Sequence, residues 1–321
     1  MDTNNLNVEE VQKSVMALSR KGKFTEAAEL LEETAAKFPS ARPQAAFQTA
    51  VFYVMAGNSP KAMDVLEAAQ QEKITFPIWP GAMPMAKLQG EPRFKKIAEA
   101  NRLLQAELTA AAKPDVIIKT PARYSEGNTY PLFLALHPWN AFAAGFSKLW
   151  QSKRAAKKYI TAYVQSSQVV APGTFGWSDF NKGKEDIKTV YDRLVQEYPI
   201  DPRRVVVSGF SQGGMLALHI ALTEFLPAAG FVVLQPGGDT PGIIKSEYIK
   251  KAAERGLRGT LITGAADRCY KQQRELSMDF QKAGLDMHFI TKPGLGHGMP
   301  KGLSRLINTA LKHIEKGVKK G

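Results

Sequence analysis

The stretch RRVVVSGFSQGGMLALHIAL, residues 203–222, decides the fold of this protein. Its β-branched run predicts a strand, and the apolar residues from Met215 onward predict a helix. Between them lies the turn Gly209-Phe210-Ser211-Gln212-Gly213. Small residues at both ends of such a turn let the backbone fold back, and the turn lifts the serine hydroxyl off the sheet at a helix N-terminus. The pattern therefore predicts Ser211 as a nucleophile.

The chain from residue 115 onward alternates short apolar, β-branched runs with helical stretches. This alternation predicts an α/β fold with a mostly parallel sheet and helices on both faces. Strands are expected at 116–119, 132–136, 169–171, 204–208, 230–235, 260–263 and 287–290, and helices at 185–198, 212–225, 246–255, 271–283 and 301–316.

A serine hydroxyl is a weak nucleophile near neutral pH, so it needs a base within hydrogen-bond reach and a carboxylate that orients the base. His297 lies in the glycine-rich loop PGLGHGMP, between the last expected strand and the last helix. His137 is the alternative base, because it directly follows the strand 132–136 and faces the same sheet edge. The chain order serine, acid, histidine favours His297.

The acid is expected to be Asp267, in the segment TGAADRCY. It follows a strand and lies between Ser211 and His297 in the chain, as the same order requires. Asp239, in QPGGDT one strand earlier, is the competing candidate. A surface turn aspartate remains the alternative for both.

An acyl-transfer site also needs two backbone N–H donors aimed at the developing oxyanion. Gln212, directly after the nucleophile, supplies the first. The second is expected from the loop HPWNAFAAG, residues 137–145, with Trp139 as the first candidate and Asn140 as the next. Loops at the carboxyl ends of strands line the cleft in such sheets, so Trp139, Trp177 and His137 are predicted to contact substrate, and Phe175 less so. Packing is the competing explanation for these side chains.

The first 112 residues contain a weak internal repeat. GKFTEAAELLEE, from Gly22, and GNSPKAMDVLEA, from Gly57, align at an offset of 35 residues, close to the tetratricopeptide period of about 34. The segment resembles tetratricopeptide-type helical hairpins, and Lys113-Pro114 suggests a boundary between domains 1–112 and 113–321. Such hairpins bind peptides, or serve as a packing appendage or dimer surface. Helices are expected near 8–20, 24–37, 43–56 and 59–71, with one more ending near Ala112.

Residues 115–316 resemble the α/β-hydrolase fold, specifically its phospholipase/carboxylesterase branch, which includes feruloyl-esterase-like proteins. The resemblance rests on the nucleophile turn, the terminal Gly-His-Gly and the stretch from 168 to 214, with its Gly-Trp loop and its Asp-Pro-Arg-Arg lead into the strand. It implies a hydrolase of carboxylic esters without cofactor or metal, with Ser211, Asp267 and His297 as the triad. The sequence HPWN departs from the glycine-rich oxyanion loop of that family.

The composition of this 321-residue chain indicates which kinds of partner it could bind. The net charge is +13, and residues 1–112 carry 13 basic and 13 acidic residues, so the whole excess lies in the second part. The densest group, from Lys148 to Lys158, predicts a solvated surface, with the attraction of an acidic substrate as the alternative. No nucleic-acid motif accompanies it. The apolar runs are too short to span a membrane. A cytoplasmic location is expected, with an exported form whose signal was removed left open.

The leading hypothesis is therefore a serine carboxylesterase acting on a small-molecule ester. A peptidase of the prolyl-oligopeptidase type is the enzyme alternative, although such domains commonly add a β-propeller and the appendage here is helical. The non-enzyme alternative is a helical-repeat adaptor, with a protein partner or dimer contact on the helices and a silent hydrolase domain. The presence of Ser211, Asp267 and His297 together argues against that alternative.

Overall fold

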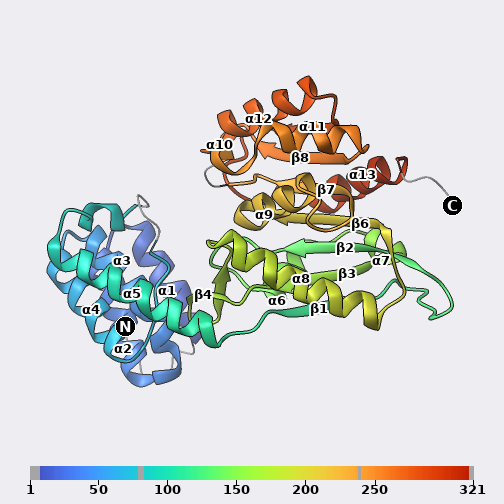
Figure 1. Cartoon of the computed structure of the whole chain (residues 1–321). Coiled ribbons are helices and arrows are strands. Elements are labelled where there is room, and N and C mark those ends of the chain that lie inside the picture. The colour runs from blue at the N-terminus through green and yellow to red at the C-terminus, as the bar shows by residue number, and fades with distance from the viewer. Residues whose placement is uncertain (1–7, 79–82, 238–239, 318–321) are drawn as a thin grey trace. The chain divides into compact units, whose positions relative to one another are not determined.

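The structure is a computed structural model that describes residues 8–78, 83–237 and 240–317. The chain divides into two compact units. One unit holds the described residues up to Ala111 together with Val169–Gly173, and the other runs from Ala112 to Gln168 and from Thr174 onward. Figure 1 colours the first helices blue and the last ones red.

The first unit is helical, as the sequence predicts. Its repeat appears as antiparallel helix pairs, in which α2 packs on α3 and α3 on α4. Helix α4 begins at a defined cap, because the side chain of Asn58 accepts a hydrogen bond from the N–H of Lys61 at 3.1 Å. The helices are α1 (Val8–Arg20), α2 (Phe24–Lys37), α3 (Arg42–Met55), α4 (Ser59–Gln71) and α5 (Pro92–Ala111), with short 3₁₀ helices at Pro39–Ala41 and Met85–Leu88.

A segment distant in sequence completes this unit. The side chain of Gln105, on α5, donates to the carbonyl of Val170 at 2.6 Å, and the hydroxyl of Thr109 accepts from the N–H of Val169 at 3.0 Å. These bonds satisfy backbone groups that a short loop would otherwise leave unpaired. They explain why Val169–Gly173 packs with the helices.

The second unit is built on a seven-stranded sheet with the order β1-β3-β2-β6-β7-β8-β9. Every neighbouring pair is parallel except β1 and β3, so the predicted mostly parallel sheet is confirmed. The parallel strands end at one sheet edge, and the loops that follow them meet there. The strands are β1 (Asp115–Lys119), β2 (Tyr130–Leu136), β3 (Ile160–Gln165), β6 (Ile200–Phe210), β7 (Ala228–Leu234), β8 (Arg258–Gly264) and β9 (Asp286–Lys292).

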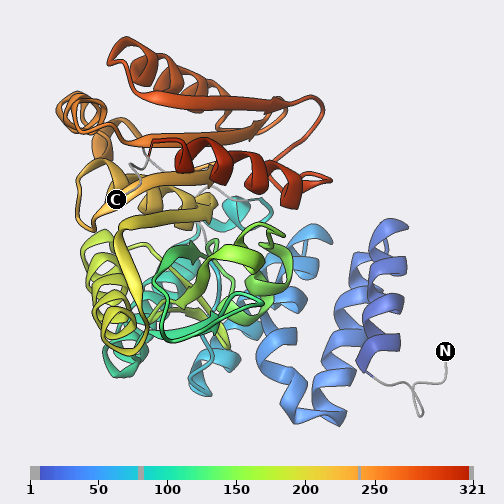
Figure 2. The same cartoon turned by 90° about the vertical axis from the view of Figure 1, so that its right-hand side faces the viewer.

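Helices cover both faces of this sheet (Figure 1). Alternation along β2 sorts the cores: Leu132, Leu134 and Leu136 enter the core under α8, α9, α11 and α12, whereas Phe133 and Ala135 enter the core under α6, α7 and α13. Figure 2 shows α13 lying along the strands in dark red. The helices are α6 (Ala143–Leu149), α7 (Ala155–Lys158), α8 (Phe180–Glu197), α9 (Ser211–Leu222), α10 (Thr240–Ile243), α11 (Ser246–Glu254), α12 (Tyr270–Lys282) and α13 (Leu303–Glu315).

One expected strand is present but does not belong to the large sheet. The neighbour of β2 is β3, Ile160–Gln165, which the sequence interpretation missed. The expected strand 169–171 exists as β4 (Gln168–Ala171), but it pairs with β5 (Thr174–Gly176) in a separate two-stranded sheet. Both runs are short and β-branched, so local pattern could not say which of them joins the large sheet.

Candidate active site

The turn at the end of β6 has the close backbone packing that its glycines predict. A Cβ atom on Gly209 would lie 2.6 Å from the carbonyl carbon and oxygen of Gly213. A Cβ atom on Gly213 would lie 2.3 Å from the carbonyl oxygen of His137 and 2.5 Å from that of Leu136. Ser211 itself has φ of +55°, a left-handed conformation that is strained for a residue with a side chain. The turn holds its hydroxyl above the sheet edge.

Tertiary folding brings the three predicted triad residues together. His297 Nε2 lies 2.8 Å from Ser211 Oγ, and His297 Nδ1 lies 2.8 Å from Asp267 Oδ2. Ser211 follows β6, Asp267 follows β8 and His297 follows β9, so all three come from the carboxyl edge of the sheet. Because the carboxylate accepts from Nδ1, the proton lies on that nitrogen and Nε2 is free to accept the serine proton.

The acid is buried and oriented by the backbone. The Asp267 side chain has no exposed surface, and its second oxygen accepts a hydrogen bond from the N–H of Cys269 at 2.7 Å. The two bonds point the carboxylate at His297. The lone cysteine, Cys269, is a free thiol that contributes its backbone N–H to this arrangement. The competing acid, Asp239, lies outside the described residues.

Gln235 holds the histidine loop, a role that the sequence interpretation missed. Its side-chain amide donates to the carbonyl of Gly296 at 2.5 Å and accepts from the N–H of Gly298 at 2.8 Å. One fully buried amide therefore bonds to the backbone on both sides of His297. The available signal was its place at the end of the predicted strand 230–235, on the same sheet edge.

Gly237 borders the nucleophile directly. Its N–H donates to the carbonyl of Ser211 at 3.1 Å, and a Cβ atom here would lie 3.5 Å from Ser211 Oγ and 3.9 Å from His297 Cε1. The absence of a side chain keeps the space beside the reacting hydroxyl open. The segment 235–237 thus contributes to the site in two ways. The Gln235 amide positions the histidine loop, and Gly237 leaves space beside the Ser211 hydroxyl.

The two expected oxyanion donors lie where the turn and the β2 loop approach each other. Gln212 is in the first turn of α9, where backbone N–H groups have no partner within the helix. The close approach of Gly213 to the carbonyls of residues 136 and 137 brings the loop with Trp139 and Asn140 beside that helix end. Trp139 is half-buried and Asn140 is exposed. The assignment of the second donor stays a prediction.

Trp177 and His137 are structural, which contradicts the expectation that their side chains contact substrate. Both are fully buried. The indole N–H of Trp177 donates to the carbonyl of His137 at 2.8 Å, and the N–H of Trp177 donates to the side-chain oxygen of Gln212 at 2.6 Å. These bonds tie the β2 loop to the nucleophile turn. An aromatic residue on a loop after a strand can turn inward, and the sequence does not show which way it turns.

Burial also explains why His137 is no base for the serine. The Nδ1–H of His137 donates to the carbonyl of Pro138 at 2.8 Å, while Nε2 accepts from the N–H of Ser166 at 3.3 Å. Loss of solvation lowers the pKa of His137 to about 4, and the bond to Pro138 opposes this only in part. Both ring nitrogens are engaged away from Ser211.

The dense group of basic side chains that ends at Lys158 lies away from this site, so it is not placed to contact an acidic substrate at Ser211. Lys153, Arg154, Lys157 and Lys158 precede β3 and so lie at the amino edge of the sheet. Ser211 lies at the carboxyl edge. Steering of substrate by direct contact with these four side chains is therefore ruled out by the topology.

Within residues 8–78, 83–237 and 240–317, no group of three or more His, Cys, Asp or Glu side chains could hold a metal ion. In the same part of the chain, no helix combines the length and apolar character needed to cross a membrane.

The segment around the nucleophile turn is similar to a known family. A model of the Phospholipase/Carboxylesterase family matches residues 178–250, which include the nucleophile turn and α9. The acyl-protein thioesterase 1 homolog 1 of Dictyostelium discoideum is 27% identical over 119 residues, which cover 36% of this chain and 51% of that protein. This chain thus matches about half the length of that curated relative.

A solved structure shares the fold. A crystal structure of an uncharacterized protein from Bacillus cereus ATCC 10987 is 21% identical, with a TM-score of 0.54, and the alignment covers 97% of this chain and all of that one. A ferulic acid esterase is 14% identical with a TM-score of 0.49, over 64% of this chain and 98% of that chain. The predicted α/β-hydrolase fold and the predicted resemblance to the phospholipase/carboxylesterase family are confirmed.

Proposed function

We propose that this chain is a serine hydrolase of carboxylic esters that forms an acyl-enzyme on Ser211. The observation that carries the proposal is the continuous hydrogen-bond series from Asp267 through His297 to Ser211 Oγ, with 2.8 Å at both histidine nitrogens. The family match over the nucleophile turn supports the same chemistry. A surface serine without function has no need of a strained backbone and a buried carboxylate behind its histidine.

The reaction follows from the geometry. His297 Nε2 takes the proton of Ser211, and Oγ attacks the acyl carbon, so the carbonyl oxygen becomes an oxyanion. The N–H of Gln212 and an N–H of the loop 137–140 stabilise that oxyanion. His297 then returns the proton to the leaving oxygen, and the ester bond breaks. Water attacks the acyl-enzyme in the reverse sense and releases the acid, while Asp267 keeps the imidazole in its productive tautomer.

The substrate class is carboxylic esters, with thioesters as a related option. The Dictyostelium relative is described as an acyl-protein thioesterase, and the same attack on an acyl carbon cleaves either bond because only the leaving atom differs. A peptidase is less favoured, since the described part of residues 1–111 is helical and forms no β-propeller.

We further propose that residues 1–112 form a tetratricopeptide-like domain, which contacts a protein partner or a second copy of this chain. The antiparallel pairing of α2, α3 and α4 supports this. Measurement of the mass of the full chain in solution by light scattering, with and without residues 1–112, would separate self-association from binding of another protein.

The test of the catalytic proposal is covalent labelling by a fluorophosphonate, followed by release of nitrophenol from acyl esters of graded chain length. Wild type should be labelled and turn over, and Ser211→Ala should do neither while its circular dichroism is unchanged. Ser304→Ala, a serine on α13 far along the chain, is the control and should behave as wild type. Labelling that persists in Ser211→Ala would refute the assignment. Parallel assays with acyl thioesters and with peptide amides decide the bond class.

A further inference from the structure

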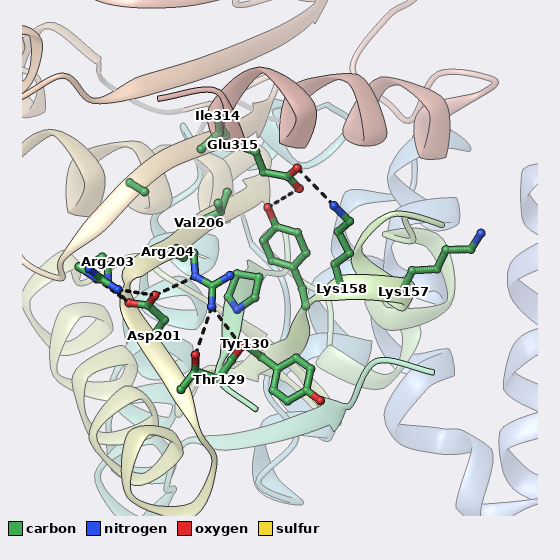
Figure 3. Close-up of a pocket in the computed structure, with 13 residues that line it drawn as sticks. Thr129, Tyr130, Lys157, Lys158, Asp201, Arg203, Arg204, Val206, Ile314 and Glu315 are labelled. Carbon is green, nitrogen blue, oxygen red and sulfur yellow. Dashed lines mark hydrogen bonds and ion pairs between the residues drawn. The ribbon is translucent and has the colours of Figure 1, made fainter. Parts of the chain in front are cut away.

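A hollow with a volume of about 660 Å³ lies in the α/β unit, away from the triad. Figure 3 shows its lining as sticks. The hollow combines four cationic side chains with an apolar floor. The cations are Lys157, Lys158, Arg203 and Arg204, and the acids are Asp201 and Glu315.

The topology separates this hollow from Ser211. Thr129 directly precedes β2, Arg203 and Arg204 are near the start of β6, and Ala229 is near the start of β7, so the hollow opens at the amino edge of the sheet. Ser211 is the seventh residue after Arg204 along the extended strand, a distance of roughly 23 Å at the rise of a strand. A molecule bound here cannot be the one that Ser211 attacks.

The charges around the hollow do not cancel. Asp201 accepts hydrogen bonds from both Arg203, at 3.2 Å, and Arg204, at 2.8 Å. Those guanidinium groups, that of Arg203 first, keep the pKa of the Asp201 carboxyl below its usual range although burial opposes them. One carboxylate therefore faces two cations, which leaves one positive charge in excess.

The same imbalance recurs at Glu315, on the other side of the hollow. Its carboxylate pairs with Arg154, lies 3.9 Å from Lys158 Nζ and accepts from the hydroxyl of Tyr159 at 3.0 Å. Lys157 is exposed and forms no ion pair with an acid among the described residues. Figure 3 shows its side chain at the edge of the group, pointing away from the other labelled side chains. The lining of the hollow thus holds four cations and two carboxylates, which leaves two positive charges in excess.

A smaller hollow of about 210 Å³ adjoins this one. It shares Lys157 and Lys158 as a common rim, and its remaining lining, Lys153, Arg154, Asn308 and Lys312, contains no acid. The shared rim, Lys157 and Lys158, therefore stands beside three further cations of the smaller hollow.

We infer that the larger hollow is a binding site for an organic phosphate with an apolar or aromatic body. A phosphate monoester carries roughly two negative charges near neutral pH, which suits the surplus of cations better than a monoanion does. Its oxygens match the forked donors of arginine. The body packs on Ala229 and on the aliphatic stems of Lys157, Lys158 and Arg204, because the deeper lining residues Val206, Ile314 and Tyr159 are at most 2% exposed. The site is independent of ester hydrolysis at Ser211.

The experiment is a calorimetric titration of the full chain with phenyl phosphate, and with inorganic phosphate as a probe without the ring. We expect saturable binding of phenyl phosphate that weakens as salt is raised, since the contacts are with exposed charges. We expect inorganic phosphate to bind more weakly, because it cannot use the apolar floor. Equal affinity for both probes, or no saturable binding of phenyl phosphate, would overturn the inference.

Variants locate the site. Lys157→Gln/Lys158→Gln should weaken phenyl phosphate binding about tenfold, from the loss of two contacts of ordinary surface strength. Lys250→Gln/Lys251→Gln, two exposed neighbours on α11 with the same change in charge, is the matched control and should bind as wild type. Equal weakening in both double variants would reduce the effect to overall charge and sink the proposal.

A third variant and an activity assay separate the two sites. Arg203→Gln alters a side chain that is 72% exposed, so it should fold and bind less tightly. Labelling of Ser211 by a fluorophosphonate should leave phenyl phosphate binding intact; loss of binding after labelling would place the probe at the triad and refute the inference. Ester hydrolysis should be the same in both lysine double variants.

Discussion

The side-chain amide of Gln235 bonds to both peptide groups that flank His297. It donates to Gly296 and accepts from Gly298, while the backbone at Gln235 has φ of +42°. A glycine-rich loop is conformationally free by itself, so other contacts must hold the imidazole of His297 in place. The Gln235 amide supplies these contacts from the end of the strand next to that of the nucleophile. Its positive φ is a strained backbone conformation at this position.

Gln235→Met should lower kcat while leaving KM nearly unchanged. The side chain has a similar volume but no polar atoms, so the loop loses both anchors and His297 leaves its productive position. Displacement of a catalytic group by about 1 Å costs on the order of 100-fold in rate. Steady-state kinetics with a nitrophenyl ester measure the effect.

Gln168→Met is the control for that substitution. The Gln168 amide makes the same pair of bonds to a loop, donating to Asp179 at 2.9 Å and accepting from it at 2.8 Å, but this loop carries no triad residue. Both variants should lose stability, by about 2 kcal/mol, from unpaired buried groups. A kcat that falls equally in both variants would mean that Gln235 acts through stability alone.

Replacement of Ser211 should separate strain from function. Glycine adopts positive φ without a steric penalty, whereas alanine, which has a Cβ atom, still pays that penalty. Ser211→Gly should therefore have a free energy of unfolding about 1 kcal/mol higher than Ser211→Ala. Both should be inactive. Urea denaturation of the two variants measures the difference, and equal stabilities would show that the turn is not strained.

Gly213→Ala should destabilise the α/β unit severely. The new methyl group would meet two backbone carbonyls, those of Leu136 and His137, within 2.5 Å, and backbone cannot move aside as a side chain can. We expect a loss of about 3 kcal/mol, at the upper end for overpacking. Gly242→Ala, with nothing within 4 Å of the added methyl, is the control and should be near wild type. A stable Gly213→Ala would contradict the close packing of the turn on the β2 loop.

His137 should make the protein less stable at mildly acidic pH. The ordinary histidine pKa is about 6.5, and burial lowers that of His137 to about 4. Between these values the unfolded chain binds a proton that the folded chain does not, so the free energy of unfolding falls as the pH falls through this range and is retained above it. The contribution lost between pH 7.5 and pH 5 is roughly 2 kcal/mol.

The variant His137→Gln isolates that contribution. Urea unfolding of wild type and variant at the two pH values gives two losses, and the loss in the variant should be smaller by the stated amount. Other titrating groups are common to both proteins and cancel. Identical losses would mean that His137 is not held neutral by burial.

Local pattern was enough for most elements of the fold. The helices of the first unit and the strand, turn and helix around Ser211 follow from hydrophobic period and from glycine, and both are local properties of the chain. The strand Ile160–Gln165 was missed because its membership of the sheet depends on pairing with β2, a contact between residues distant in sequence.

The sequence by itself determined which residues could perform the chemistry: Ser211, Asp267 and His297 stand in an order that parallel strands bring to one edge. Only the tertiary structure decided which neighbours serve them. It turned Trp177 and His137 inward, placed Gln235 against the histidine loop and set the basic side chains at the opposite edge. The physical reason is that chemistry is carried by residue type, whereas burial and hydrogen-bond partners are settled only when distant segments pack.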